Sequence, residues 1–172
     1  MAKIIFGVLA LAVISGLASG DELPQRKAGL WEIVSTDASA KRPPMKQLLC
    51  LDRETDALLN KMGIATSQQA CAKNEMRVTG NRVTIHAVCD FGGSQLTSDG
   101  VITYSGDSNY RNEMHGHFQP PVAGVGDTHI VQDGKWVGAC PADMKPGDLA
   151  MNQGPGSHEV KVNLRSMFGA HP

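Results

Sequence analysis

The stretch over residues 71–89 constrains the fold of this chain more than any other, because it has the pattern of a β-hairpin. Alternating apolar and polar residues flank Gly80-Asn81, a pair that readily adopts the positive φ of a tight turn. A two-residue turn brings apolar side chains together on one face in two pairs, Met76 with Ile85 and Val78 with Val83. A slip of one residue would place charged side chains against apolar ones, so the sequence predicts this register.

The composition favours a single β-rich domain. The chain has 172 residues, which is enough for one domain. Glycine is frequent, with 19 residues, and aromatic residues make up only 5%, a combination typical of turn-rich β proteins. The net charge is −1 and no cluster of Lys and Arg occurs, so we expect no nucleic-acid partner and no anionic membrane surface.

Residues 1–20 have the pattern of a signal peptide. Lys3 precedes an apolar run over residues 4–14, and small residues follow at 18–20. The run is shorter than the roughly 20 apolar residues that a membrane span needs, and no cysteine follows it closely. We therefore expect cleavage, no stable membrane anchor after cleavage, and a periplasmic or secreted protein.

All four cysteines follow this leader, and an even number in an oxidising compartment predicts two disulfides. Zinc is a weaker explanation, because no pair has the C-x-x-C spacing. The side on which each cysteine lies in the predicted register favours Cys50–Cys71 with Cys89–Cys140. The pairing Cys71–Cys89 with Cys50–Cys140 stays open if a bulge reverses Cys71.

The rest of the chain indicates further strands and one early helix. The predicted strands are 29–36, 45–51, 95–104, 110–118, 128–132 and 135–140, the last two joined by a turn at Asp133-Gly134. The helix is expected to run for about ten residues, from an Asp52 cap to Gly63. The sum is a mainly β protein: an antiparallel meander forming a curved sheet or a small barrel or clam, with one short helix inserted early. We assign it residues 21–140 and expect a largely irregular tail over residues 141–172.

Three short segments resemble a bacterial envelope family known as domain of unknown function 3617. The first, R-K-A-G-L-W-E-I over residues 26–33, is similar to the family's Lys-Pro-Gly-Leu-Trp-Glu opening, with Ala28 where proline is usual. The second is L-C-L-D-R-E-T-D over residues 49–56, followed by Cys71 and the segment 83–90. The third is V-I-T-Y-S-G-D-S over residues 101–108, leading to W-V-G-A-C at the last cysteine. The resemblance spans residues 26–150. It implies a secreted or periplasmic β-rich domain and no catalytic residues.

Four side chains are candidates for facing a ligand. His115 and His117 lie two apart on one face of a predicted strand, with His129 on the next strand as the best third ligand for a metal ion. The alternative is that both histidines are simply solvated. Trp31 and Trp136 could line a pocket, although aromatic residues on apolar strand faces more often belong to a core.

The sequence contains no recognised catalytic motif, so we do not expect an enzyme. The favoured hypothesis is a non-enzymatic binding module for a small apolar or amphipathic ligand. The alternative is an envelope structural or interaction protein that binds a protein partner through the sheet face or the tail. A metal-handling role for His115 and His117 ranks third, and we expect neither a cofactor nor a metal ion.

Overall fold

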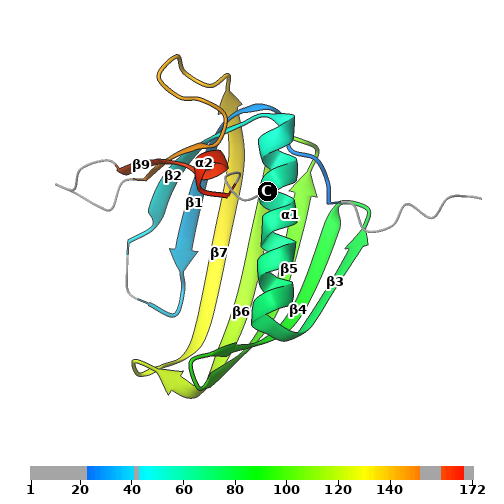
Figure 1. Ribbon diagram of the computed structural model, residues 1–172, viewed down its shortest axis with the longest axis vertical. Helices are drawn as coiled ribbons and strands as arrows, with labels where there is room; N and C mark the ends of the chain where they lie inside the picture. Colours follow the sequence, from blue (N-terminus) through cyan, green and yellow to red (C-terminus); the bar gives the residue numbers. More distant parts are fainter. Residues whose placement is uncertain (1–22, 41–42, 152–159, 169–172) are drawn as a thin grey trace, which may run out of the picture.

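The computed structural model describes residues 23–40, 43–151 and 160–168, and the predicted signal peptide lies outside them (Figure 1). One antiparallel sheet of nine strands has the order β3-β4-β5-β6-β7-β1-β2-β8-β9 and does not close. The predicted fold class is therefore confirmed. The elements are β1 (Gly29–Asp37), β2 (Met45–Leu51), α1 (Arg53–Ala70), β3 (Cys71–Thr79), β4 (Arg82–Phe91), β5 (Ser94–Ser105), β6 (Asn109–Val122), β7 (Val125–Gly138), β8 (Asp148–Met151), β9 (Val160–Asn163) and α2 (Leu164–Phe168).

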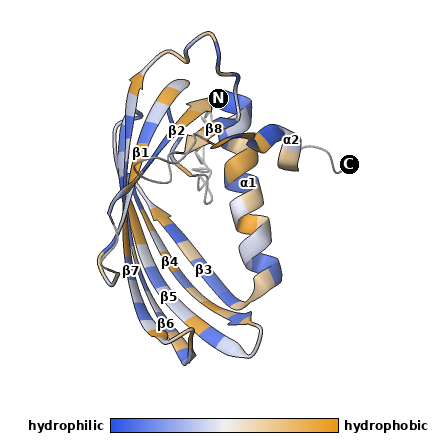
Figure 2. Ribbon diagram, turned by 90° about the vertical axis from the view of Figure 1, so that its left-hand side faces the viewer, coloured by the Kyte–Doolittle hydropathy of each residue, from blue (hydrophilic) through white to orange (hydrophobic). Residues whose placement is uncertain are grey.

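The sheet is bowed, and α1 lies across its concave side (Figure 2). We call the face toward α1 the inner face and the opposite face the outer face. The inner face carries the main core, against which Leu59 of α1 packs. The buried members of this core are Trp31, Ile33, Leu49, Leu51, Val83, Tyr104 and Tyr110. Among the described residues, no helix is both long and apolar enough to cross a membrane.

The hairpin of β3 and β4 forms in the predicted register. Met76 is paired with Ile85, and Val78 with Val83. Gly80 has a φ of 59°, the left-handed conformation that the two-residue turn requires. The alternation of apolar residues was therefore sufficient to predict which side chains of this hairpin face the core.

The predicted disulfide pairing is wrong, and the alternative pairing is observed: Cys71–Cys89 and Cys50–Cys140. The register of β3 and β4 shifts between Cys71 and Lys73, which places Cys71 opposite Cys89. A bulge of this kind turns the side chain toward the other face of its strand. Two disulfides indicate an oxidising, non-cytoplasmic location.

The predicted hairpin at Asp133-Gly134 is also wrong, because β7 runs through both residues as one strand. Gly134 is paired with Tyr110 on β6, and a Cβ atom at this glycine would overlap the tyrosine ring. The glycine therefore makes room for an aromatic side chain and does not form a turn. Its effect on the sheet is to let the ring of Tyr110 lie across the neighbouring strand.

The early helix starts where predicted and ends later. The side chain of Asp52 accepts a hydrogen bond of 2.7 Å from the backbone N–H of Thr55, as an N-cap does. Gly63 does not end α1, which continues to Ala70. A glycine inside a helix costs only about 1 kcal/mol relative to alanine, which contacts elsewhere can offset.

The tail contains more regular structure than predicted. Strand β8 pairs with β2, and β9 pairs with β8, so the tail extends the sheet by two strands. The segment before β8 lies on the outer face of β1 and β2, where it forms a second small core with the Cys50–Cys140 disulfide. The buried members of this core are Cys50, Met144 and Ala150.

Candidate functional site

A row of apolar residues crosses the inner face and is only partly covered. Residues directly opposite one another in an antiparallel sheet share a face, so the register defines the row. Its members, from β3 to β7, are Met76, Ile85, Gly100, Met114 and Ile130. The side chains of Met76, Ile85 and Met114 are partly buried, and Ile130 is 41% exposed. We call this set the apolar row.

Helix α1 covers the apolar row incompletely. It is 18 residues long, yet its only buried residues are Thr55 and Asp56, both in the first turn. At that end Asp56 accepts hydrogen bonds from the backbone N–H of Arg26, at 3.1 Å, and from its guanidinium, at 2.7 Å. At the other end, the Cys71–Cys89 disulfide and a hydrogen bond from Asn74 to Ser67 hold the helix to the sheet. The helix is thus fixed at both ends and leaves its central turns partly accessible.

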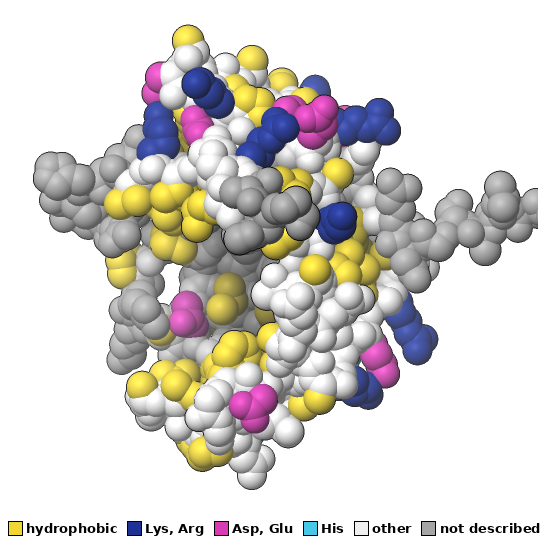
Figure 3. Space-filling view, in the orientation of Figure 1, with side chains coloured by type: hydrophobic (Ala, Val, Ile, Leu, Met, Phe, Trp, Pro, Cys, Tyr) yellow, Lys and Arg dark blue, Asp and Glu magenta, His cyan; other side chains and the backbone are white. Residues whose placement is uncertain are grey.

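The space-filling view shows a hollow beside α1, over β6 and β7 (Figure 3). Hydrophobic side chains and an acidic one are visible inside it. The apolar row crosses the inner face of these two strands at Met114 and Ile130. We call this space the inner hollow.

Polar groups lie next to the apolar row on the same face. Asn112 on β6 is paired with Gln132 on β7, which is paired with Ser35 on β1. The amide of Gln132 accepts a hydrogen bond of 3.1 Å from the hydroxyl of Tyr110 and donates one of 3.2 Å to Ser35. The Oδ1 atom of Asn112 is buried and has no hydrogen-bond partner among the described residues. Such an acceptor is costly unless a ligand or water satisfies it.

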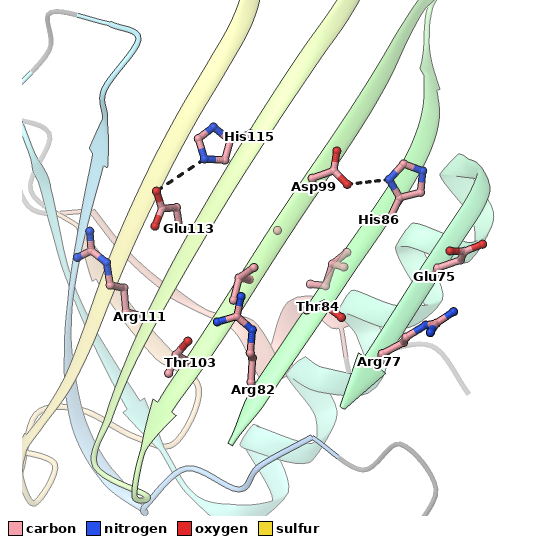
Figure 4. Close-up of a pocket in the computed structure, with 13 residues that line it drawn as sticks. Glu75, Arg77, Arg82, Thr84, His86, Asp99, Thr103, Arg111, Glu113 and His115 are labelled. Atoms are coloured by element: carbon pink, nitrogen blue, oxygen red, sulfur yellow. Dashed lines mark hydrogen bonds and ion pairs between the residues drawn. The ribbon is translucent and has the colours of Figure 1, made fainter. Parts of the chain in front are cut away.

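The outer face carries charged side chains around a trough of about 460 Å³ (Figure 4). Its floor comes from β3 to β6, and arginines and carboxylates surround it. Four residues form a continuous cross-strand row from β4 to β7: His86, Asp99, His115 and His129. Each of the four described histidines lies beside a carboxylate, and the Nδ1 atom of His86 is 2.8 Å from Oδ1 of Asp99.

Glu113, His115 and His129 come together at one end of this row. Glu113 and His115 share the outer face of β6, and His115 is directly opposite His129 on β7. The Oε1 atom of Glu113 is 2.9 Å from Nε2 of His129 and 3.7 Å from Nε2 of His115. The two imidazole rings are stacked, with centroids 4.1 Å apart. The hydrogen bond from His129 holds the pKa of Glu113 below its usual range.

The four side chains that the sequence analysis named as ligand-facing candidates lie in different surroundings. Trp31 is 0% exposed, and its Nε1 donates a hydrogen bond of 2.8 Å to the carbonyl of Lys27, so it belongs to the core. Trp136, paired with Trp31, is partly buried, and the Nζ atom of Lys27 lies 4.0 Å from its ring. His117 pairs with Asp127 at 2.8 Å.

The structure therefore brings His129 next to His115, whereas His117 lies outside the cluster. Sequence reasoning missed Glu113 as a member. The signal was present, because Glu113 and His115 are two residues apart and so share a strand face. No comparable sequence signal marks Asn112, since only the fold shows that its Oδ1 atom is buried.

Comparison with known proteins identifies the family of the domain but assigns it no activity. No curated protein and no solved structure matches the chain. One family model matches residues 26–140, which contain all four cysteines, strands β1 to β7 and both sites described above. The chain belongs to the family described as protein of unknown function (DUF3617).

Proposed function

We propose that this protein is a non-enzymatic binding module of the periplasm or the extracellular space, and that it holds a small amphipathic molecule in the inner hollow. The observation that carries the proposal is the apolar row, which spans five strands on the face toward α1 and stays partly open. Strands in a sheet are about 4.8 Å apart, so four steps from β3 to β7 give an apolar wall about 19 Å long. This length suits an extended acyl chain.

The polar groups beside the row favour an amphipathic ligand over a purely apolar one. The unpartnered Oδ1 atom of Asn112 can accept one hydrogen bond from a hydroxyl or amide group of the ligand. Ligand pockets typically combine such a placed polar group with an apolar lining. The fixed ends of α1 support the same proposal, because a preorganised hollow loses little entropy on binding.

The test is titration of the oxidised protein with 11-(dansylamino)undecanoic acid, whose fluorescence rises in an apolar site. Ile130→Glu places a charge on the apolar row, and Val137→Glu places one on the same strand at a position of similar exposure, 45%. Losing the contact of one apolar side chain costs about 1.5–3 kcal/mol, so Ile130→Glu should weaken binding about ten- to a hundredfold. Val137→Glu should bind like the wild type.

Two results would count against the proposal. One is equal weakening by the two substitutions, and the other is the absence of saturable binding by the wild type. If the probe does not bind, the protein-partner hypothesis becomes the better explanation. Capture experiments on the envelope fraction, with and without residues 141–172, would then be the next measurement.

A further inference from the structure

We propose that Glu113, His115 and His129 form a binding site for one divalent transition-metal ion, such as Zn²⁺ or Cu²⁺, on the outer face of the sheet. One ligand atom from each residue lies within 4.8 Å of the others. Two imidazole nitrogens and one carboxylate oxygen are a ligand set that suits zinc and copper. An ion held by three protein ligands keeps at least one position for water or a small anion.

The separations of the ligand atoms fit a tetrahedral ion. With metal–ligand bonds of about 2.0–2.1 Å, two ligands of a tetrahedron are about 3.3 Å apart. The Oε1 atom of Glu113 is 2.9 Å from one imidazole nitrogen and 3.7 Å from the other. These two distances bracket the required value, and the stacked imidazole rings must rotate out of their parallel arrangement so that both Nε2 lone pairs converge on the ion. The backbone can stay as it is, because β6 and β7 already hold the residues directly opposite each other.

The protonation states are also compatible with an ion. A neutral imidazole carries its proton on either nitrogen. With the proton on Nδ1, the Nε2 atom of each histidine presents a lone pair toward the Glu113 carboxylate, where the ion would lie. Binding then replaces the hydrogen bond between His129 and Glu113 with two metal–ligand bonds.

The other histidines of the outer face provide the contrast. His117 lies two residues beyond His115 on the same face and has nearly the same side-chain exposure, 58% against 60%. It contacts one carboxylate, that of Asp127. His86 likewise contacts Asp99. Among the described residues, His115 and His129 are the only histidines that the strand register places beside both a carboxylate and a second imidazole.

The test is equilibrium dialysis of the untagged, oxidised full chain against Zn²⁺, with bound metal counted by mass spectrometry. We expect one equivalent for the wild type. His115→Ala and His129→Ala should each weaken binding about tenfold or more, since losing even an outer-shell partner has an effect of that size. Glu113→Gln, which keeps the side-chain shape, should also weaken binding. His117→Ala is the matched control and should bind like the wild type.

A second readout identifies the ligands directly. The electron paramagnetic resonance spectrum of bound Cu²⁺ should show coupling to two imidazole nitrogens in the wild type and to one in His115→Ala. Thermal melts of every variant check folding, and the exposed position of His115 makes an unfolded variant unexpected. Equal losses in His117→Ala and His115→Ala would overturn the proposal, as would wild-type protein that binds no zinc.

Discussion

Replacement of Asn112 by valine tests whether this buried amide is kept for binding at the expense of stability. Its Oδ1 atom is buried and has no partner among the described residues, and a buried, unsatisfied acceptor costs about 1–3 kcal/mol. Valine removes the unsatisfied atom and suits a strand, so Asn112→Val should stabilise the ligand-free protein by about 1–2 kcal/mol. With a urea m-value of about 2 kcal/mol/M, the unfolding midpoint rises by about 0.5–1 M.

The matched control is Asn109→Val, the same substitution at an exposed position of the same strand. This control measures the general gain in the free energy of unfolding from placing valine in β6. The difference between the two variants then gives the effect of the buried Oδ1 atom of Asn112. Asn112→Val should also bind the dansyl fatty acid less tightly than the wild type, because the sulfonamide N–H of the probe is a donor that Oδ1 can accept. A gain no larger than that of Asn109→Val, or a loss of stability, would refute the reasoning.

Three further predictions concern stability. Asp56→Asn should destabilise the protein by about 3 kcal/mol in the same urea titration, because it leaves the largely buried Arg26 without its carboxylate. The control Glu54→Gln removes an exposed ion pair with Arg165 and should destabilise the protein by less than about 1 kcal/mol. Burial raises the pKa of Tyr104 and of Tyr110, because the folded state favours the neutral phenol. The resulting contribution to the free energy of unfolding is fully present below about pH 10 and is lost as the pH rises through the raised pKa values. Ultraviolet titration should therefore show tyrosinate at a higher pH in native protein than in urea, and coincident curves would contradict the buried position. Removing the Cys50–Cys140 disulfide, which spans 90 residues, should cost about 4–5 kcal/mol, against about 3 for the 18-residue hairpin disulfide, and a reversed order of the melts would contradict this estimate.

The local pattern of the sequence predicted those elements whose structure depends on neighbouring residues. The hairpin over residues 71–89 is the clearest case, because a period-2 pattern and a two-residue turn leave one register that buries the apolar side chains. The strand over Met45–Leu51 and the Asp52 cap were predicted for the same kind of reason. In each case the deciding interactions lie within a few residues along the chain.

The wrong predictions involve contacts between residues that are distant in sequence. The Asp133-Gly134 pair has the composition of a turn, but the ring of Tyr110 on the neighbouring strand requires the glycine within a continuous β7. The pairing of Cys71 depends on a one-residue bulge that no side-chain pattern marks. Strand β8 gains hydrogen bonds by pairing with β2, about a hundred residues earlier, and β9 then pairs with β8; periodicity in the tail does not reveal this arrangement.

The candidate sites were predictable to different degrees. Alternation along one strand placed Glu113, His115 and His117 on one face, but the register with β7 decides that His129 joins the first two. Trp31 was a candidate for facing a ligand, yet it is fully buried in the main core of the inner face. The inner hollow arises from how α1 crosses the sheet, a relation between elements that no stretch of sequence contains.

The two proposed sites can be tested independently, because adjacent residues on the same strands point to opposite faces. On β7, Ile130 belongs to the apolar row and His129 to the proposed metal site. A strand alternates its side chains between the two faces, so a substitution at one residue leaves the other site's contacts in place. Ile130→Glu should therefore lower affinity for the fatty acid and keep zinc binding, and His129→Ala should do the reverse. A loss of both ligands in either variant would mean that the substitution disturbs the sheet itself, and the assignment of separate functions to its two faces would then fail.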